Sequence, residues 1–301
     1  MNTTTDTVNV ATVSASRRAV DFFELTKPRI VLMVLITAFV GYYAGSGRVP
    51  DYLQLLRMLI GTALAAGGTL TLNQFIEREI DAKMERTRRR PLPDGRVQPQ
   101  DALWFGVLLT LLGLGYLAAA VNLLSAAVAA TITLSYLLIY TPMKRASSLC
   151  VPVGAIPGAL PPVIGWAAAR HAIEPGAFIL FAIMFLWQIP HFLAIAWIYR
   201  EDYARGGLPM LPVLDPEGRI TGRQAVAHTL ALVVVSLTPP AAGLAGSVYL
   251  AGALVLGVGF AAVAVASAVK RDLVWARRLF LASLAYLVLL CAIFFVDRLH
   301  G

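Results

Sequence analysis

Residues 73–97 read NQFIEREIDAKMERTRRRPLPDGRV, a highly charged stretch in a chain that is apolar almost everywhere else. Five carboxylates and seven basic side chains follow directly on a long apolar run. The acids are Glu77, Glu79, Asp81 and Glu85, with Asp94 further along, and the bases are Arg78, Lys83, Arg86, Arg88, Arg89, Arg90 and Arg96. A chain that places so few charges elsewhere has a reason to gather them in one loop.

On a helix, Asn73, Glu77 and Asp81 recur at intervals of four residues and stay near one face, roughly 6 Å apart along the axis. Two carboxylates so placed can share one or two hard cations, and Mg²⁺ completes such a shell with water and phosphate oxygens. The neighbouring arginines are suited to bidentate phosphate contacts. The stretch therefore predicts a site for a magnesium diphosphate. The alternative is a cytoplasmic loop whose arginines only fix topology and whose acids only balance them.

The composition predicts a polytopic membrane protein. Of 301 residues, 58% are hydrophobic and only 14% charged, with a mean hydropathy of +0.72, whereas soluble domains carry about 25% charged residues. Residues 1–25 lack the apolar core of a secretory signal, and we expect a flexible cytoplasmic tail followed by a single transmembrane domain, 26–301. The net charge of +8 could suggest a nucleic-acid-binding protein, but the distribution of the charges along the chain argues against that function. The two cysteines predict neither a disulfide framework nor a thiolate metal site.

Nine apolar runs are long enough to span a bilayer. They are 29–46, 53–75, 102–121, 123–141, 151–169, 176–199, 225–246, 248–268 and 277–296. Tight joints at Val121-Asn122 and Gly246-Ser247 predict antiparallel neighbours. Of the 25 Lys and Arg residues, 21 fall on one side of this arrangement, which predicts a cytoplasmic N-terminus and an outside C-terminus.

The sixth run ends in a second acidic group, where Asp202 lies beside Glu201 and is followed by Arg205. Two acidic helix ends that face each other could hold two metal ions on one diphosphate and neutralise the charge that grows as it leaves. An ordinary interfacial cluster of charges at the end of a helix is the alternative.

His191 lies within the sixth run, eleven residues before Asp202 and on the same helix face, about 16 Å away along the axis. An ionisable side chain within the membrane is a functional candidate, and this one could ligate a haem iron or carry a proton. The alternative is an interhelical hydrogen bond to a hydroxyl or carbonyl. Pro190, just before it, should loosen the helix.

Three further features are ambiguous. Lys144 and Arg145 end the fourth run, and Thr26-Lys27-Pro28-Arg29 opens the first. Both groups could clamp phosphate or could only fix topology. GAIPGALPPVIGW, at 154–166, has three glycines and three prolines within a span, which indicates a helix that lines a cavity or one that packs closely.

Several motifs resemble those of the haem O synthases (protoheme IX farnesyltransferases), a branch of the UbiA-type intramembrane prenyltransferase superfamily. They are LTKPRI at 25–30, NQFIEREIDAKMERTRRRPLP at 73–93, YTPMKR at 140–145, GALPPVIGW at 158–166, WQIPHF around His191 and DYARGGLPMLPV from Asp202. The similarity runs from Phe22 to the C-terminus. The first acidic motif occurs throughout the superfamily in variant form, whereas the RTRRRPLP, PHF and PMLPV segments are specific to the haem branch.

The chain departs from the superfamily at three positions. Quinone-forming members usually have aspartate where Glu77 stands, and they have a fuller aspartate pair where this chain has only Asp202. Many haem-branch members have an asparagine near Cys150, where this chain has none.

The resemblance implies an all-α, polytopic bundle of nine transmembrane helices around a central cavity that opens to the cytoplasmic side and sideways to lipid. Farnesyl diphosphate would bind at the rim on Mg²⁺ held by Glu77, Asp81 and Asp202, with Asn73 in support. The expected diphosphate clamps are Arg86, Arg88, Arg90, Lys144 and Arg145. His191 is the expected contact to the haem iron.

The implied reaction joins the farnesyl group to a vinyl group of haem b and adds water, giving haem O for terminal oxidases. The implied location is the bacterial inner membrane, and the implied partners are haem A synthase or oxidase assembly factors. One alternative is a quinone-type prenyltransferase, which the PHF and PMLPV segments disfavour. Another is a transporter of an anionic substrate, which predicts functional polar residues through the full membrane depth.

Overall fold

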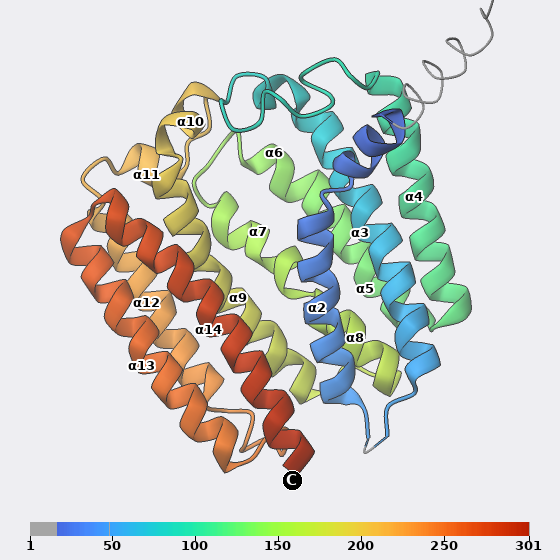
Figure 1. Ribbon diagram of the computed structural model, residues 1–301, viewed down its shortest axis with the longest axis vertical. Coiled ribbons are helices and arrows are strands. Elements are labelled where there is room, and N and C mark those ends of the chain that lie inside the picture. Colours follow the sequence, from blue (N-terminus) through green and yellow to red (C-terminus); the bar gives the residue numbers. More distant parts are fainter. Residues whose placement is uncertain (1–16, 48, 301) are drawn as a thin grey trace, which may run out of the picture.

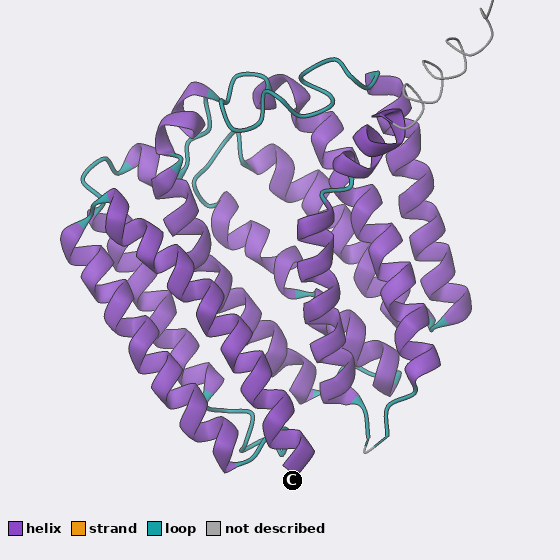
Figure 2. Ribbon diagram, viewed as in Figure 1, coloured by secondary structure: helices purple, strands orange, loops and turns teal. Residues whose placement is uncertain are grey.

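The computed structural model describes residues 17–47 and 49–300, and within these ranges every regular element is a helix (Figure 2). The helices are α2 (Pro28–Gly45), α3 (Tyr52–Asp81), α4 (Pro99–Ala120), α5 (Leu123–Leu134), η1 (Ser135–Tyr140), α6 (Thr141–Met143), α7 (Cys150–Ala159), α8 (Pro161–Arg170), α9 (Pro175–Ile198), α10 (Arg200–Arg205), α11 (Leu211–Leu214), α12 (Arg219–Ser236), α13 (Ser247–Lys270) and α14 (Leu273–His300). The all-α expectation is confirmed.

Helix starts follow from local chemistry. Pro28, Pro99 and Pro175 open α2, α4 and α9, where the missing N–H of proline leaves no helical hydrogen bond unmade. The side chain of Asp51 accepts hydrogen bonds from two backbone N–H groups at the start of α3, and that of Asn122 accepts one, from Ser125, at the start of α5. These caps satisfy donors that a helix end leaves free.

Eight described helical segments are long and apolar enough to cross a membrane. Two of them join consecutive helices: Leu123–Met143 contains α5, η1 and α6, and Cys150–Arg170 contains α7 and α8. The eight coincide with eight of the nine predicted runs. The remaining run falls on α12, whose first turns carry Arg219 and Arg223. A ninth crossing therefore stays a prediction.

The prediction for 225–246 is wrong in its second half. Helix α12 ends at Ser236, and turns that include Pro239 and Pro240 connect it to α13. Proline lacks the N–H that would extend the helix and clashes with the preceding turn. The joint expected at Gly246-Ser247 is therefore a longer connection, 237–246, whereas the short joint at Val121-Asn122 is confirmed.

The segment before α2 also differs from the expected flexible tail. Residues 17–25 form a helix. Phe22 packs edge-on against Phe105 of α4 at 5.0 Å between ring centroids, and Arg18 pairs with Asp101 at 2.9 Å. The side chain of Leu25 is fully buried. The rest of the predicted tail, 1–16, lies outside the described residues.

Close approach of helices relies on small side chains. The backbone of Gly41 and Gly165 lies so near the facing helix that an added Cβ would overlap backbone atoms of Pro162 and Ala38, respectively, and α2 and α8 are therefore in direct backbone contact. Gly68 of α3 meets α4 in the same way, at Thr110. Small residues at such crossings are typical of membrane helices, where packing rather than water exclusion drives association.

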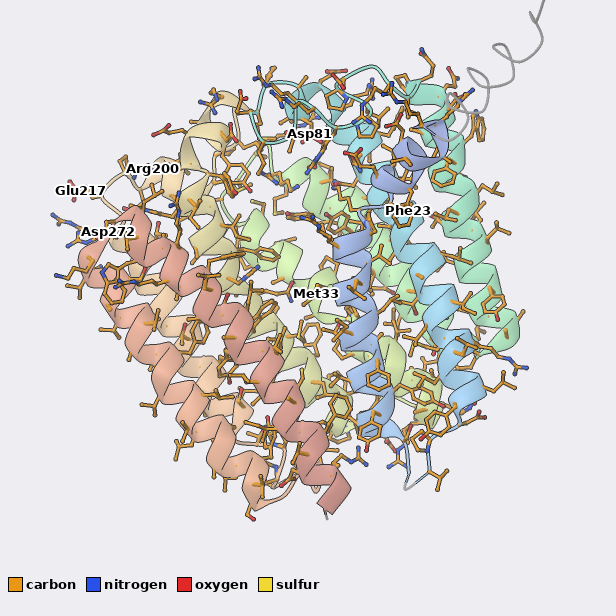
Figure 3. The ribbon with its side chains drawn as sticks, viewed as in Figure 1. Phe23, Met33, Asp81, Arg200, Glu217 and Asp272 are labelled. Atoms are coloured by element: carbon orange, nitrogen blue, oxygen red, sulfur yellow. The ribbon has the colours of Figure 1, made fainter. Side chains whose placement is uncertain are left out.

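The chain forms one bundle in which α3, α4 and α5 lie on one side, α9, α12, α13 and α14 on the other, and α2, α7 and α8 between them (Figure 1). The loop from α3 to α4, helix α6 and helices α10 and α11 gather at one end, at the top of the view. We call it the charged end, defined by residues 82–97, Lys144 and α10. Asp81 and Arg200, on separate helices, both lie there (Figure 3).

Polar and apolar side chains are distributed as expected for a lipid-facing bundle. Large apolar residues such as Leu108 and Val255 are 59% and 71% exposed, whereas Asn73, Thr71 and Ser283 are fully buried. A water-soluble bundle would show the opposite pattern. The polar interior is therefore where function must be sought.

Candidate functional site

Helix α3 carries its polar side chains into the bundle over its last three turns. Asn73, Glu77 and Asp81 are 0%, 8% and 2% exposed, and all three lie on the one uninterrupted helix α3. The predicted shared face is therefore confirmed. Buried carboxylates require partners, because an uncompensated charge in an apolar interior is costly.

Each of these side chains has a cationic partner from a different segment. Lys144, just after α6, donates to Glu77 Oε1 at 2.8 Å, and Arg90 of the α3–α4 loop donates to Asp81 Oδ2 at 2.6 Å. Lys27, at the start of α2, donates to Asn73 Oδ1 at 2.9 Å. We call this group the polar cluster; its members are Lys27, Asn73, Glu77, Asp81, Arg90, Thr141 and Lys144.

Thr141 ties the cluster to the fourth span. It accepts a hydrogen bond from Asn73 Nδ2 at 3.2 Å and donates to the carbonyl of Tyr136 at 2.8 Å. The ammonium of Lys144 lies 4.7 Å from the centre of the Tyr140 ring. Asn73 therefore uses both ends of its amide, and the cluster has a fixed network before any ligand arrives.

The two lysines differ in their electrostatics. Burial lowers the pKa of Lys27 to about 7, and the nearby charge of Arg90 adds to this effect. Burial also disfavours the charged form of Lys144, but Tyr140 and Glu77 outweigh it and hold the pKa of Lys144 well above its usual value. Lys144 is thus a permanent cation, whereas Lys27 can gain or lose its charge near neutral pH.

Only two of the five predicted diphosphate clamps, Arg90 and Lys144, reach the cluster. Arg86 lies over the ring of Tyr199 at 5.3 Å, and Arg88 pairs with Glu85 at 2.5 Å on the exposed surface. Arg145 donates to the carbonyl of Ile76 at 3.3 Å. These three cations contact other groups and not the carboxylates of the polar cluster.

Asp202 has different neighbours from those expected of a metal ligand. Its carboxylate accepts hydrogen bonds from the backbone N–H groups of Glu85 and Arg86, at 2.9 and 3.2 Å, and pairs with Arg205. Burial raises the pKa of Asp202, but these hydrogen bonds outweigh it and lower that pKa overall. Asp202 therefore fastens the loop that carries Arg90 onto α10.

The predicted metal triad of Glu77, Asp81 and Asp202 is consequently not assembled. Among the described residues, no group of three or more His, Cys, Asp or Glu side chains lies close enough to hold one metal ion. Asp202 faces backbone donors of the 85–86 turn, whereas Glu77 and Asp81 face the interior cations. The two carboxylates of α3 remain as a pair of candidate ligands.

Sequence reasoning left Lys27 undecided and did not select Thr141 or Tyr140. Lys27 was visible only as a basic residue before a proline-started helix. Thr141 and Tyr140 lie next to Lys144 in the chain, but a threonine or tyrosine in an apolar run gives no signal that separates a buried network from ordinary packing.

His191 lies in the bundle interior between α9 and α14. Its Nδ1 is 2.7 Å from Ser283 Oγ, and its ring packs against Trp187 and Phe280 at 4.8 and 5.1 Å between centroids. The interhelical hydrogen bond that we considered as the alternative is therefore present. It occupies one ring nitrogen, so the role of the other as an iron ligand stays a prediction.

An apolar pocket with about 480 Å³ of empty space, its open mouth included, lies between α2, α8, α9 and α14. Its lining includes Thr37, Val40, Pro162, Met184, Leu290 and Phe294. Because Thr37 is ten residues along α2 from Lys27, the pocket begins about 15 Å from Lys27 of the polar cluster. Pro162 shows that the proline-rich span both lines a cavity and packs closely against α2.

Neither of the two cysteines forms a disulfide. Cys150 and Cys291 are both free. Cys150 is buried, with its Sγ 3.6 Å from the sulfur of Met210. No disulfide is formed, as predicted.

Comparison with known proteins places this chain in a family. The family model described as the UbiA prenyltransferase family matches residues 34–295. A protoheme IX farnesyltransferase of Solibacter usitatus is 49% identical over 287 residues, 92% of this chain and 98% of that protein. One from Myxococcus xanthus is 41% identical over 292 residues, 97% of this chain and 99% of that protein.

Solved structures share the fold at low identity. A structure of digeranylgeranylglyceryl phosphate synthase superposes with a TM-score of 0.80 at 18% identity and covers 95% of this chain and 100% of its own. A UbiA homologue from Archaeoglobus fulgidus bound to DMAPP and Mg²⁺ gives 0.67 at 16% identity, over 92% of this chain and 99% of its own. The chain belongs to the UbiA prenyltransferase family, in its protoheme IX farnesyltransferase branch.

Proposed function

We propose that the polar cluster binds and ionises farnesyl diphosphate and that the farnesyl group is transferred to a vinyl group of haem b. The observation that carries this proposal is the convergence of Lys27, Arg90 and Lys144 on the buried face of α3. Three cations drawn from three segments into an apolar bundle are expected where an anion is to be bound.

The charge balance of the cluster suits a metal-bound diphosphate. With Lys27 protonated, three positive charges meet the two negative charges of Glu77 and Asp81. Lys144 and Arg90 can turn from these carboxylates to phosphate oxygens and so release the carboxylates for a cation. The same cations then stabilise the charge that develops as the bond to diphosphate breaks.

The donor set fits Mg²⁺. The family includes a homologue whose structure is bound to Mg²⁺. In this chain, Glu77 and Asp81 offer two hard carboxylates one helical turn apart. Mg²⁺ commonly binds one or two protein carboxylates and completes its coordination with phosphate oxygens and water. Once bound, the ion neutralises the leaving diphosphate. Asn73 supports the site by holding Lys27 and Thr141 in place. Asp202 supports it indirectly, by fixing the loop that carries Arg90.

The apolar pocket provides for the farnesyl chain. The chain would run from the charged end along α2 towards Thr37 and Val40, whose pocket is lined almost entirely by apolar side chains. Breaking the carbon–oxygen bond leaves an allylic cation on farnesyl and both electrons on diphosphate. An apolar wall excludes water from this cation until the acceptor reaches it.

The acceptor step follows from the chemistry of a vinyl group. The terminal vinyl carbon of haem b attacks the farnesyl cation and forms the new carbon–carbon bond, which moves the positive charge to the adjacent carbon. Water adds there and loses a proton, giving the hydroxyethylfarnesyl group of haem O. His191 would hold haem b through its iron, deeper in the bundle than the polar cluster.

Membership of the farnesyltransferase branch argues for this enzyme over the transporter and over a quinone-forming relative. We place the protein in the bacterial inner membrane with its charged end towards the cytoplasm, the side favoured by the distribution of Lys and Arg. Haem A synthase or oxidase assembly factors are the expected partners, because haem O is consumed downstream.

The test uses purified protein in detergent with haem b, farnesyl diphosphate and Mg²⁺, and identifies the product pigment by mass. Haem O is expected. Replacement of haem b by an aromatic quinone precursor tests the alternative acceptor, and Glu77→Gln controls for reaction outside the site. A prenylated aromatic product without haem O would overturn the proposal.

A further inference from the structure

Ser283 on α14 is the meeting point of two side chains from consecutive turns of α9. Trp187 Nε1 donates to the backbone carbonyl of Ser283 at 2.7 Å, and His191 Nδ1 lies 2.7 Å from its hydroxyl. Ser283 itself is fully buried. Two hydrogen bonds from one helix to a single residue fix both the distance and the rotation of α9 relative to α14 at this level.

The hydroxyl of Ser283 has only one proton, and its position can be deduced. Ser283 Oγ is 2.6 Å from the carbonyl oxygen of Phe280 and 2.7 Å from His191 Nδ1. A carbonyl oxygen cannot donate, so the serine proton must point to Phe280 if both contacts are hydrogen bonds. The bond to His191 then needs the proton on Nδ1. In the neutral imidazole this leaves Nε2 as an unprotonated lone pair.

The other ring nitrogen is left open. Among the described residues none offers Nε2 of His191 a hydrogen bond, and this atom is not among the buried polar atoms that are sealed without a partner. The ring faces are packed against Trp187 and Phe280. The imidazole is thus held by its faces and by Nδ1, with its Nε2 edge accessible.

We infer that Ser283 is a positioning residue for haem b, whose hydroxyl holds the proton on Nδ1 of His191 and so keeps the Nε2 lone pair available to the iron. This inference rests on the proposed role of His191 as the iron contact. Histidines that ligate metals usually donate their second N–H to a neighbouring oxygen, which fixes the tautomer and orientation and makes the ligating nitrogen more basic. Here the neighbouring oxygen belongs to a different helix.

The first experiment needs no haem. Nitrogen-15 NMR of the histidine-labelled protein reports which ring nitrogen carries the proton, and loss of one signal set in His191→Gln identifies His191 among the four histidines. We expect Nδ1 protonated in the wild type and in Ser283→Thr, and a shift towards Nε2 protonation in Ser283→Ala. An unchanged tautomer in Ser283→Ala overturns the inference, whatever the enzyme's activity.

The second experiment titrates haem b into the same proteins and records affinity and the iron–nitrogen stretching band of the ferrous complex. Ser283→Ala should weaken haem b binding about tenfold or more and lower the band frequency, and Ser283→Thr should restore both. Ser283→Cys keeps a similar volume with a weaker acceptor and serves if the alanine variant does not fold.

Ser236→Ala is the matched control. Ser236 is also fully buried and accepts a 2.7 Å hydrogen bond from Tyr286 on α14, so its loss should lower thermal stability without moving the haem band. If His191→Gln leaves the haem complex unchanged, the proposed iron contact fails. If His191→Gln removes the band and Ser283→Ala leaves affinity and band frequency as in the wild type, only the role of Ser283 fails.

Discussion

Lys144→Met separates the binding role of the polar cluster from its structural role. The ammonium of Lys144 lies 2.8 Å from Glu77, and the two side chains are only 16% and 11% exposed. Removing one partner of such a pair leaves the other charge buried, and we expect a loss of about 3 kcal/mol in unfolding free energy, the low end of the range, since some exposure remains. The lost hydrogen bond to diphosphate should cost about 1.5–3 kcal/mol.

Loss of the hydrogen bond between Lys144 and diphosphate corresponds to a fall of roughly 10- to 150-fold in kcat/KM for farnesyl diphosphate. The double variant Lys144→Met, Glu77→Gln isolates the structural effect, because Glu77 is itself a proposed metal ligand whose loss lowers activity on its own. It removes both charges, so thermal stability should recover towards that of the wild type while kcat/KM stays low. Stability is measured by thermal melting in detergent, and turnover by the appearance of haem O.

Lys83→Met is the matched control, because Lys83 is an exposed lysine of the adjacent loop and the substitution makes the same change of charge and size. It should leave both stability and kcat/KM close to those of the wild type. Recovery of activity along with stability in the double variant would refute the reasoning, since it would mean that neither Lys144 nor Glu77 takes part in binding the diphosphate and its metal ion.

Three further predictions concern the same site. The affinity for farnesyl diphosphate should fall as pH rises through about 7, because the anion binds the charged form of Lys27, and that form is lost above the Lys27 pKa of about 7. Calorimetric titration from about pH 6 to 9 measures this fall. The Lys27→Arg variant should not show it, because its guanidinium stays charged. Asp202→Asn should speed hydrogen exchange at the amides of Glu85 and Arg86 and raise KM for farnesyl diphosphate with little change in Mg²⁺ dependence; a weakened Mg²⁺ response would instead make Asp202 a metal ligand. Asp81→Asn should shift the magnesium titration of turnover to higher concentration, and wild-type rates at limiting Mg²⁺ would remove Asp81 from the metal site.

The sequence by itself was enough for features that depend on neighbours along the chain. Apolar runs of sufficient length identified eight spans. A chain segment in lipid must form all its backbone hydrogen bonds internally, as a helix does, so a span is recognisable from length and hydropathy alone. The spacing of Asn73, Glu77 and Asp81 identified their common face, because helical geometry is the same wherever the helix lies. The end of α12 was missed because the apolar residues after Ser236 hide the break made by two prolines.

The partners of the charged side chains were decided only by the tertiary structure. The sequence around Asp202 suggests a metal ligand, yet its carboxylate accepts hydrogen bonds from backbone N–H groups more than a hundred positions away. Nearly every residue has a backbone N–H, so the sequence does not indicate which of them a carboxylate will contact. Lys27 and Lys144 meet at α3 only because the packing of three segments brings them there, and Ser283 meets His191 only because α9 and α14 cross at that depth. Local geometry sets which face a side chain lies on, but the choice of partner is settled by helix packing, which depends on shape complementarity across the whole bundle.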